Sequence, residues 1–261
     1  MQEAPAWVKT KLNEIRAEQG LDPIENPSYG YWAPCARKVN DHLYRMYYCI
    51  VVNNYIKTGG RTYDGSWTER AFIGVMETSD PASNNWEDKG FVICSSSDKG
   101  TNWNRASEGD WNAYFKFNAI DPSFIITPEG EHWLIYGSWH SGIAAVQLNP
   151  ETGKTLAELP KSYGTAAEIA PYGKLIFTRT NGGRWQGAEA PEIVYHDGYY
   201  YLFLAYDGLD IPYNTRVLRS TKVDGPYETL NGAVTDASKG ANNNPTVLTH
   251  PYKFSEGYGW V

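Results

Sequence analysis

One pattern occurs three times along this chain and constrains the fold more than any other feature. Each copy begins with a proline after an alanine or aspartate, continues through a polar turn and ends in an aromatic run. The copies start at WAP (32–34), DP (121–122) and EAP (189–191), and their aromatic runs lie at 43–49, 132–138 and 199–205. Extended, aromatic-rich runs on either side of a turn indicate two antiparallel strands. The sequence therefore predicts a β-hairpin repeated three times.

Further strand candidates lie between and after the hairpins. They are AFIGVMET (71–78), FVICSS (91–96), GIAAVQL (142–148), KLIFTRT (174–180) and TRVLRST (215–221). Each repeat then holds about four strands, which is the content of one β-propeller blade. The predicted fold class is all-β, with about three complete blades plus flanking pieces.

The start of the chain differs from the rest. Trp7, Val8, Leu12 and Ile15 follow the spacing of one helix face, and Gly20 is the expected stop. We expect residues 1–30 to form a short helix and a linker into the first complete blade. Residues 1–261 are expected to form a single, incomplete propeller domain.

Composition narrows the class of ligand. The chain has 23 basic and 30 acidic residues, a net charge of −7 and no long basic block, which argues against nucleic acid and anionic membranes as partners. Aromatic residues make up 15% of the chain, including 10 Trp and 20 Tyr, and such rings suit the C–H faces of neutral sugars. Strand propensity alone explains part of this enrichment.

The cysteines and the apolar runs exclude further classes of site and protein. Cys35, Cys49 and Cys94 are too few and too scattered for a disulfide framework or a cysteine-rich zinc site. The chain has no apolar run long enough for a membrane span, and its first residues lack the apolar core of a signal peptide.

The repeat prolines indicate where chemistry would take place. A proline at the first residue of a strand costs no ladder hydrogen bond and holds the preceding residue in a restricted conformation. In a propeller the innermost strand of each blade starts at the central channel, so residues at these entrances converge. Asp121 and Glu189 lie at the entrance in consecutive units.

Two carboxyl groups among aromatic rings suit glycoside hydrolysis, in which one acid protonates the leaving oxygen and a second carboxylate assists water or attacks. Burial and mutual repulsion would keep one of them protonated near neutral pH. The alternative is that both acids only satisfy backbone N–H groups at strand entrances.

The motifs YWAP (31–34), NAIDPSF (118–124), YGSWHSGI (136–143), EAPEI (189–193) and TRVLRSTKVDGPY (215–227) resemble the successive blade motifs of glycoside hydrolase family 43. That family consists of five-bladed propeller enzymes that cleave arabinan, xylan and related glycans. The resemblance covers nearly the whole chain, and the pairing of NAIDP with GSWHSGI resembles its arabinan-cleaving branch.

The resemblance implies specific roles. Glu189 matches the general acid of an inverting mechanism, and Asp121 matches the auxiliary aspartate that orients this acid. Asn118, Ser138, Trp139 and His140 match cleft residues, and Trp32 matches a stacking ring. Glu192 is expected to be structural, and His140 is about as consistent with simple packing as with ligand contact.

The chain also departs from the family pattern. The family's general base lies in a His-Asp-Pro context in its first blade and has no match here. Asp22-Pro23 and Asp80-Pro81 do not precede a repeat hairpin, so neither is predicted to be the base. The start and the end resemble links into missing neighbours, which predicts that the first and last blades are absent. Cys35 stands where the family commonly has aspartate.

The predicted function is inverting hydrolysis of arabinan or arabino-oligosaccharides, without a cofactor for the chemistry. Two alternatives remain: a β-xylosidase or other pentosidase of the same fold, and a carbohydrate-binding propeller without catalysis. The resemblance allows a structural calcium in the central channel, a neutral plant cell-wall glycan as partner, and a secreted, periplasmic or cell-surface location.

Overall fold

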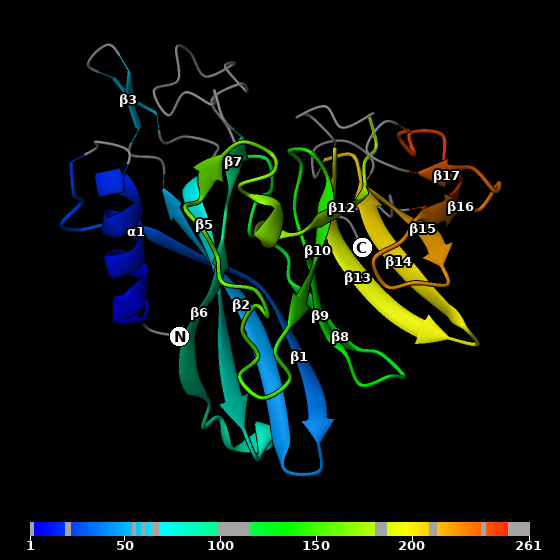
Figure 1. Ribbon diagram of the computed structural model, residues 1–261, viewed down its shortest axis with the longest axis horizontal. Coiled ribbons are helices and arrows are strands. Elements are labelled where there is room, and N and C mark those ends of the chain that lie inside the picture. The colour runs from blue at the N-terminus through cyan, green and yellow to red at the C-terminus, as the bar shows by residue number, and fades with distance from the viewer. Residues whose placement is uncertain are drawn as a thin grey trace, which may run out of the picture.

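The computed structural model describes residues 3–18, 22–53, 56–58, 61–63, 68–98, 115–180, 187–208, 213–235 and 239–249. Three antiparallel sheets stand side by side (Figure 1), with the N-terminal sheet on the left and the C-terminal one on the right. No helix in this described part is long and apolar enough to cross a membrane. The predicted all-β class is confirmed.

The first sheet has the strand order β1-β2-β5-β6. Its strands are β1 (Tyr29–Asn40), β2 (Leu43–Asn53), β5 (Thr68–Thr78) and β6 (Glu87–Cys94). The second sheet has the order β8-β9-β10-β12. Its strands are β8 (Ser123–Ile126), β9 (His132–Tyr136), β10 (Ile143–Leu148) and β12 (Lys174–Phe177). Both sheets have four strands in chain order, as the repeat predicts for a blade.

The third sheet is larger than the expected four strands. It contains β13 (Ala188–His196), β14 (Tyr199–Tyr206), β15 (Asn214–Ser220), β16 (Tyr227–Thr229), β17 (Val234–Thr235) and β18 (Thr246–Thr249). β16 pairs with the C-terminal end of β15 and β18 with its N-terminal end. The outer edge of β15 is therefore shared by two short strands, and "about four strands" is corrected to six for this unit.

The remaining elements are short. They are β3 (Ile56–Thr58), β4 (Arg61–Tyr63), β7 (Ser97–Asp98), β11 (Tyr163–Gly164) and the 3-10 helices Pro81–Ser83 and Ala170–Tyr172. β3 pairs with β4, and β7 pairs in parallel with β11. The second pairing connects the end of the first sheet to the loop before β12.

The predicted N-terminal helix is confirmed as α1 (Ala6–Glu18). Val8, Leu12 and Ile15 are buried, and the Trp7 ring packs edge-on against the rings of Phe72 and Phe91 with centroids 6.1 and 5.8 Å apart. Because these two phenylalanines belong to β5 and β6, α1 covers part of the outer side of the first sheet (Figure 1). Gly20, the predicted stop, lies outside the described residues.

Each predicted hairpin forms. β1 pairs with β2, β8 with β9, and β13 with β14, all antiparallel. The first strands of the three hairpins, β1, β8 and β13, are neighbours in space, with β8 between the other two. This arrangement brings the three proline-containing segments together, as the convergence argument predicts. Only Pro122 directly precedes its strand. Pro34 and Pro191 lie inside β1 and β13, within register shifts, so the expectation of a proline at the first residue of a strand is corrected for these two.

Apolar residues fill the two spaces between the sheets. Between the first and second sheets, the rings of Tyr47 and Phe124 pack with centroids 5.0 Å apart. Between the second and third, the rings of Phe177 and Tyr206 pack edge-on with centroids 5.9 Å apart. Two continuous cores therefore hold the three sheets in fixed positions around the strand entrances.

Candidate active site

The strand entrances share an uncommon backbone conformation. Ala33, Asp121 and Ala190, each directly before a proline, have φ of 40°, 54° and 51°. Helical φ/ψ is disfavoured before proline, and positive φ is costly for residues other than glycine. The ladder between β1 and β2 shifts register between Trp32 and Cys35, and the ladder of β13 with β14 shifts between Glu189 and Glu192. Each of these two bulges contains a repeat proline, Pro34 or Pro191, and turns the side chains there out of the strand pattern.

The three entrances line one cavity of about 310 Å³. Its walls are 33–37 from β1, Asp121 and Pro122 from the entrance to β8, and 190–192 from β13. The cavity therefore lies where the three inner strands converge. Aligned on their prolines, Asp121 is one residue before the proline and Glu189 two residues before it, so the two acids occupy adjacent rather than equivalent places in the repeat.

The carboxyl group of Glu189 is held by side chains on both oxygens. Its Oε2 accepts hydrogen bonds from Ser138 Oγ at 3.1 Å and from Trp139 Nε1 at 2.9 Å. Its Oε1 accepts a hydrogen bond from the Tyr213 hydroxyl. Ser138 and Trp139 follow β9 of the second sheet and Tyr213 directly precedes β15 of the third, so two sheets fix this one group.

The turn that carries Trp139 is itself attached to the strand of Glu189. Trp139 has φ of 60°, and its backbone N–H donates to the carbonyl oxygen of Ala188 at 3.0 Å. The carbonyl of Gly187 accepts from Arg179 Nη1 at 2.6 Å and from the Asp207 N–H at 2.8 Å. Residues 187–189 are therefore anchored through both backbone and side chain.

Asp121 contacts the residue next to Glu189. Its Oδ2 accepts a hydrogen bond from the N–H of Ala190 at 3.0 Å. Burial, with a smaller contribution from the nearby Glu189 carboxylate, raises the pKa of Asp121 to about 7 against the opposing effect of the Ala190 hydrogen bond. The two acids are thus close enough to interact, and Asp121 changes charge near neutral pH.

Glu192 serves a different purpose from Glu189. It forms an ion pair with Arg37 of β1, and its Oε2 accepts from Ser123 Oγ of β8 at 2.9 Å. Ser123 Oγ in turn accepts from the Ile193 N–H at 3.2 Å. These contacts connect the three inner strands, which agrees with the structural role expected for Glu192.

The predicted cleft residues fall into two groups. Ser138 and Trp139 contact Glu189 directly. Asn118 and His140 are 1% and 0% exposed, and Asn118 Oδ1 accepts from the buried Ser95 hydroxyl at 3.0 Å. His140 packs beside the Phe115 ring with centroids 5.6 Å apart. These two residues lie beneath the surface, where they can shape the floor of a cleft.

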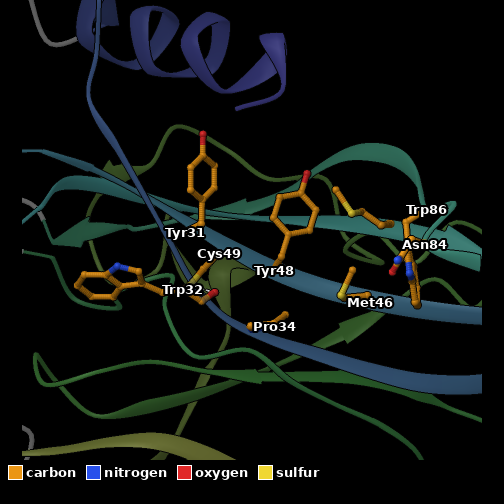
Figure 2. A pocket seen from close by; sticks show the side chains of 9 residues that line it. Tyr31, Trp32, Pro34, Met46, Tyr48, Cys49, Asn84 and Trp86 are labelled. Atoms are coloured by element: carbon orange, nitrogen blue, oxygen red, sulfur yellow. Dashed lines mark hydrogen bonds between the residues drawn. The ribbon is translucent and has the colours of Figure 1, made fainter. Parts of the chain in front are cut away.

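Trp32 is half exposed and lies beside the cavity rather than in its wall. It lines a separate groove of about 840 Å³ on the first sheet. Figure 2 shows the lining side chains, which carry no charge: Tyr31, Trp32, Pro34, Met46, Tyr48, Cys49, Met76, Asn84 and Trp86. Because side chains alternate along β2 and Tyr47 packs on the second sheet, Met46 and Tyr48 must face away from that sheet.

Sequence reasoning missed Tyr213. It belongs to no motif of the repeat, and the pairing of β13 and β15 with β14 in the third sheet brings its hydroxyl to Glu189. Arg37 was missed for the same reason, because its partner Glu192 lies 155 residues away.

The rejected Asp-Pro steps do not lie at the cavity. Asp80 caps the 3-10 helix Pro81–Ser83, where its Oδ1 accepts from the Ala82 N–H at 3.0 Å. The Asp22 carbonyl accepts from Arg16 Nε at 2.5 Å near α1. Both contacts agree with structural roles.

The residues around the cavity do not fit a calcium site. Within the described ranges there is no cluster of three or more His, Cys, Asp or Glu that could hold a metal. Of the carboxylates in the wall, Glu192 is paired with Arg37, and Asp121 is bonded to Ala190. Calcium prefers six to eight oxygen ligands.

Comparison with known proteins agrees with this geometry. The sequence profile of glycosyl hydrolases family 43 matches residues 9–250. The chain belongs to glycosyl hydrolase family 43. The family 43 relatives include a protein of Thermotoga petrophila named extracellular endo-alpha-(1->5)-L-arabinanase, 32% identical over 200 residues. They also include the extracellular endo-alpha-(1->5)-L-arabinanase 1 of Bacillus subtilis, 30% identical over 207 residues.

Solved family 43 structures share the fold. An exo-1,5-alpha-L-arabinanase from a bovine ruminal metagenomic library aligns over 97% of this chain and 67% of its own, with a TM-score of 0.62 and 28% identity. An endo-arabinanase from Bacillus licheniformis aligns over 85% of this chain and 61% of its own, with a TM-score of 0.59 and 28% identity. These neighbours are five-bladed propellers, so the propeller fold is confirmed.

The alignments with the curated relatives cover only part of those proteins. The alignments cover 75% and 77% of this chain but only 36% and 50% of the Thermotoga and Bacillus relatives. The chain therefore spans half or less of the length of these two relatives.

Proposed function

We propose that this family 43 chain belongs to an enzyme that hydrolyses arabinan or arabino-oligosaccharides with inversion at the anomeric carbon. One observation carries the proposal: Asp121, in the cavity wall, accepts a hydrogen bond from the N–H of Ala190, the wall residue that directly follows Glu189, so acids from neighbouring sheets lie close together beside the cavity. Two interacting carboxyl groups beside a cavity are the equipment for general acid catalysis at a glycosidic oxygen.

The proposed roles follow from the contacts. Glu189 protonates the leaving oxygen, because its carboxyl group is held rigidly at the entrance of β13. Asp121 orients the strand of Glu189 through the Ala190 N–H and adjusts the local charge by titrating near neutral pH. Trp139 and Ser138 position the acid and border the sugar site. Trp32 offers a half-exposed ring for stacking, and the buried Asn118 and His140 shape the floor.

The substrate assignment rests on the relatives. The curated relatives are named for arabinan linkages, and one neighbouring structure is an arabinanase complexed with arabinohexaose. A neutral arabinan also suits the net charge of −7 and the aromatic side chains. Several of these relatives are named extracellular, and we propose the same location for this protein.

We propose that the general base lies on a part of the propeller beyond the three described sheets. The groove on the first sheet supports this idea (Figure 2). The second and third sheets each bury one face against the preceding sheet. The first sheet presents Met46, Met76 and Trp86 in a groove on the corresponding side. We propose that a further propeller sheet covers this face and carries the base.

The function is tested by incubating linear arabinan with the 261-residue chain and with the longest polypeptide that its gene encodes, followed by a reducing-end assay. We expect turnover by the longer polypeptide and little from the 261 residues. Glu189→Gln should lower turnover by about 10³-fold, because a positioned general acid contributes about that much. Glu131→Gln is the matched control, and it should leave most activity because Glu131 also accepts from a tryptophan indole but is exposed and lies outside the cavity wall.

The outcomes separate the alternatives. Unchanged activity in Glu189→Gln would refute the proposed acid. Saturable arabinan binding without turnover in either polypeptide would show a carbohydrate-binding propeller. Faster turnover of β-xylosides than of arabinan would show a pentosidase of different specificity. Full activity of the 261 residues would refute a base on a further sheet.

A further inference from the structure

The contacts of Glu189 distinguish its two oxygens. Trp139 Nε1 donates to Oε2 at 2.9 Å, and an indole nitrogen can donate but cannot accept. Oε2 therefore accepts from the indole in every protonation state of the site, and the bond is strongest when the carboxyl proton is on the other oxygen, because a carbonyl oxygen accepts better than the oxygen of a carboxylic O–H. Ser138 Oγ lies 3.1 Å from the same oxygen and can donate to it as well.

Oε1 has a different partner. The Tyr213 hydroxyl is hydrogen-bonded to it, and a hydroxyl group can both donate and accept. A proton on Oε1 can therefore be accommodated by rotation of the Tyr213 O–H, whereas a proton on Oε2 would face the Trp139 N–H. Burial and the contact with Glu189 raise the pKa of Tyr213, which keeps its hydroxyl protonated.

We propose that Tyr213 is a positioning residue that assigns the transferable proton of Glu189 to Oε1, while Trp139 keeps Oε2 unprotonated. This inference rests on the proposed function and deepens it. During transfer the O–H bond at Oε1 breaks, an O–H bond forms on the leaving glycosidic oxygen, and Glu189 keeps the electron pair as a carboxylate. Tyr213 then donates to the oxygen that has lost its proton.

The position of Tyr213 suits this role. It directly precedes β15, and Asn214 at the start of that strand is bonded to Asp207 Oδ2 at 2.8 Å. Asp207 also forms an ion pair with Arg179 at 2.8 Å, and Arg179 holds the Gly187 carbonyl. The hydroxyl of Tyr213 and the strand of Glu189 are therefore fixed to the same framework, so their relative position is maintained.

A first test does not require turnover. In ¹⁵N-labelled 261-residue chain, the indole N–H resonance of Trp139 is assigned by its loss in Trp139→Phe. We expect Tyr213→Phe to move this resonance upfield, because a carboxyl group without its second anchor rotates and weakens the Trp139 bond. The control is Tyr195→Phe, an exposed tyrosine on β13, which should leave the resonance in place. An unmoved Trp139 resonance in Tyr213→Phe, with a folded spectrum, would overturn the proposal.

A second test uses the longest active polypeptide and aryl α-L-arabinofuranosides with phenols of different acidity. For a weakly acidic phenol, Tyr213→Phe should lower kcat about ten-fold with KM little changed, which corresponds to one hydrogen bond to a charged group. For a strongly acidic phenol the loss should nearly vanish, because that leaving group needs no proton. An equal loss with both phenols would show a merely structural role. If the wild-type enzyme is inactive on every arabinofuranoside, the proposed function fails. The Trp139 indole resonance then still tests the positioning role of Tyr213.

Discussion

Asp121 Oδ2 accepts a hydrogen bond from the backbone N–H of Ala190 at 3.0 Å, so a carboxyl group of the second sheet is attached to the strand of Glu189 in the third. This contact crosses from one sheet to the next at the wall of the central cavity. Because sheet packing alone leaves some freedom along the strands, a polar contact at the strand entrance fixes the register between the two acids.

The first prediction concerns the pH dependence of stability. Burial raises the pKa of Asp121 from 3.8 to about 7, so the folded state binds a proton more tightly than the unfolded state does. The stabilisation from this proton is complete below the unfolded pKa and is lost as the pH rises through the folded pKa. The wild-type free energy of unfolding should therefore fall relative to Asp121→Asn between pH 4 and 7, by at most about 1.4 kcal/mol per pH unit.

The measurement is urea unfolding of both proteins across this pH range. Asparagine retains an oxygen that can accept the Ala190 N–H, so the comparison isolates the charge. Parallel curves for the two proteins from pH 4 to 8 would show that Asp121 does not titrate in this window.

The second prediction concerns the backbone before Pro191. Ala190 is exposed and has φ of 51°, a region in which a β-branched side chain is strongly disfavoured. Ala190→Val should therefore destabilise the protein by about 1–3 kcal/mol. Ala36→Val is the matched control, because Ala36 is also exposed at the cavity wall but lies in β1 without a positive φ. Equal unfolding midpoints for the two variants would contradict the prediction.

Much of this arrangement could be read from the sequence. Aromatic runs after a polar turn predicted β2, β9 and β14, and the recurring proline marked the segments that hold Asp121 and Glu189. The division of the last strand position between β16 and β18 was not predicted, because these strands contain only three and four residues. Tyr213 and Arg37 were not predicted as site residues, since long-range strand pairing brings Tyr213 to Glu189 and the convergence of β1 with β13 brings Arg37 to Glu192, neither of which a local pattern shows.

The third prediction concerns an ion pair within the first sheet, between β2 and β5, whose buried arginine also contacts the loop after β10. The Arg45 side chain is fully buried, and its Nη2 lies 2.7 Å from Glu77 Oε1. Its guanidinium also donates to the carbonyl of Pro150 at 3.2 Å. Removing one partner leaves the other charge poorly compensated, so Arg45→Met should lower the free energy of unfolding by about 3–5 kcal/mol.

The control for this pair is Lys38→Met. Lys38 pairs with Asp41 on the surface, with side chains 52% and 86% exposed, and such pairs contribute about 0–1 kcal/mol. Thermal unfolding followed by circular dichroism compares the two variants. Similar Tm values for Arg45→Met and wild type would show that water replaces the buried contacts.

The last prediction concerns the three free thiols, Cys35, Cys49 and Cys94, all of which are buried. Burial raises the pKa of each, that of Cys49 to about 12, and the thiolate is the form that reacts with alkylating agents. Iodoacetamide at pH 8 should therefore label the folded protein far more slowly than the urea-unfolded protein. Cys35 and Cys49 both line a hollow, but Cys35 should react first because it is 7% exposed, compared with 1% for each of the other two. Peptide mass spectrometry gives the order of labelling. As a control, Cys35→Ser should remove the fastest phase. Labelling of Cys94 before Cys35 would contradict the prediction and would show that the space between the first two sheets opens before the cavity admits the reagent.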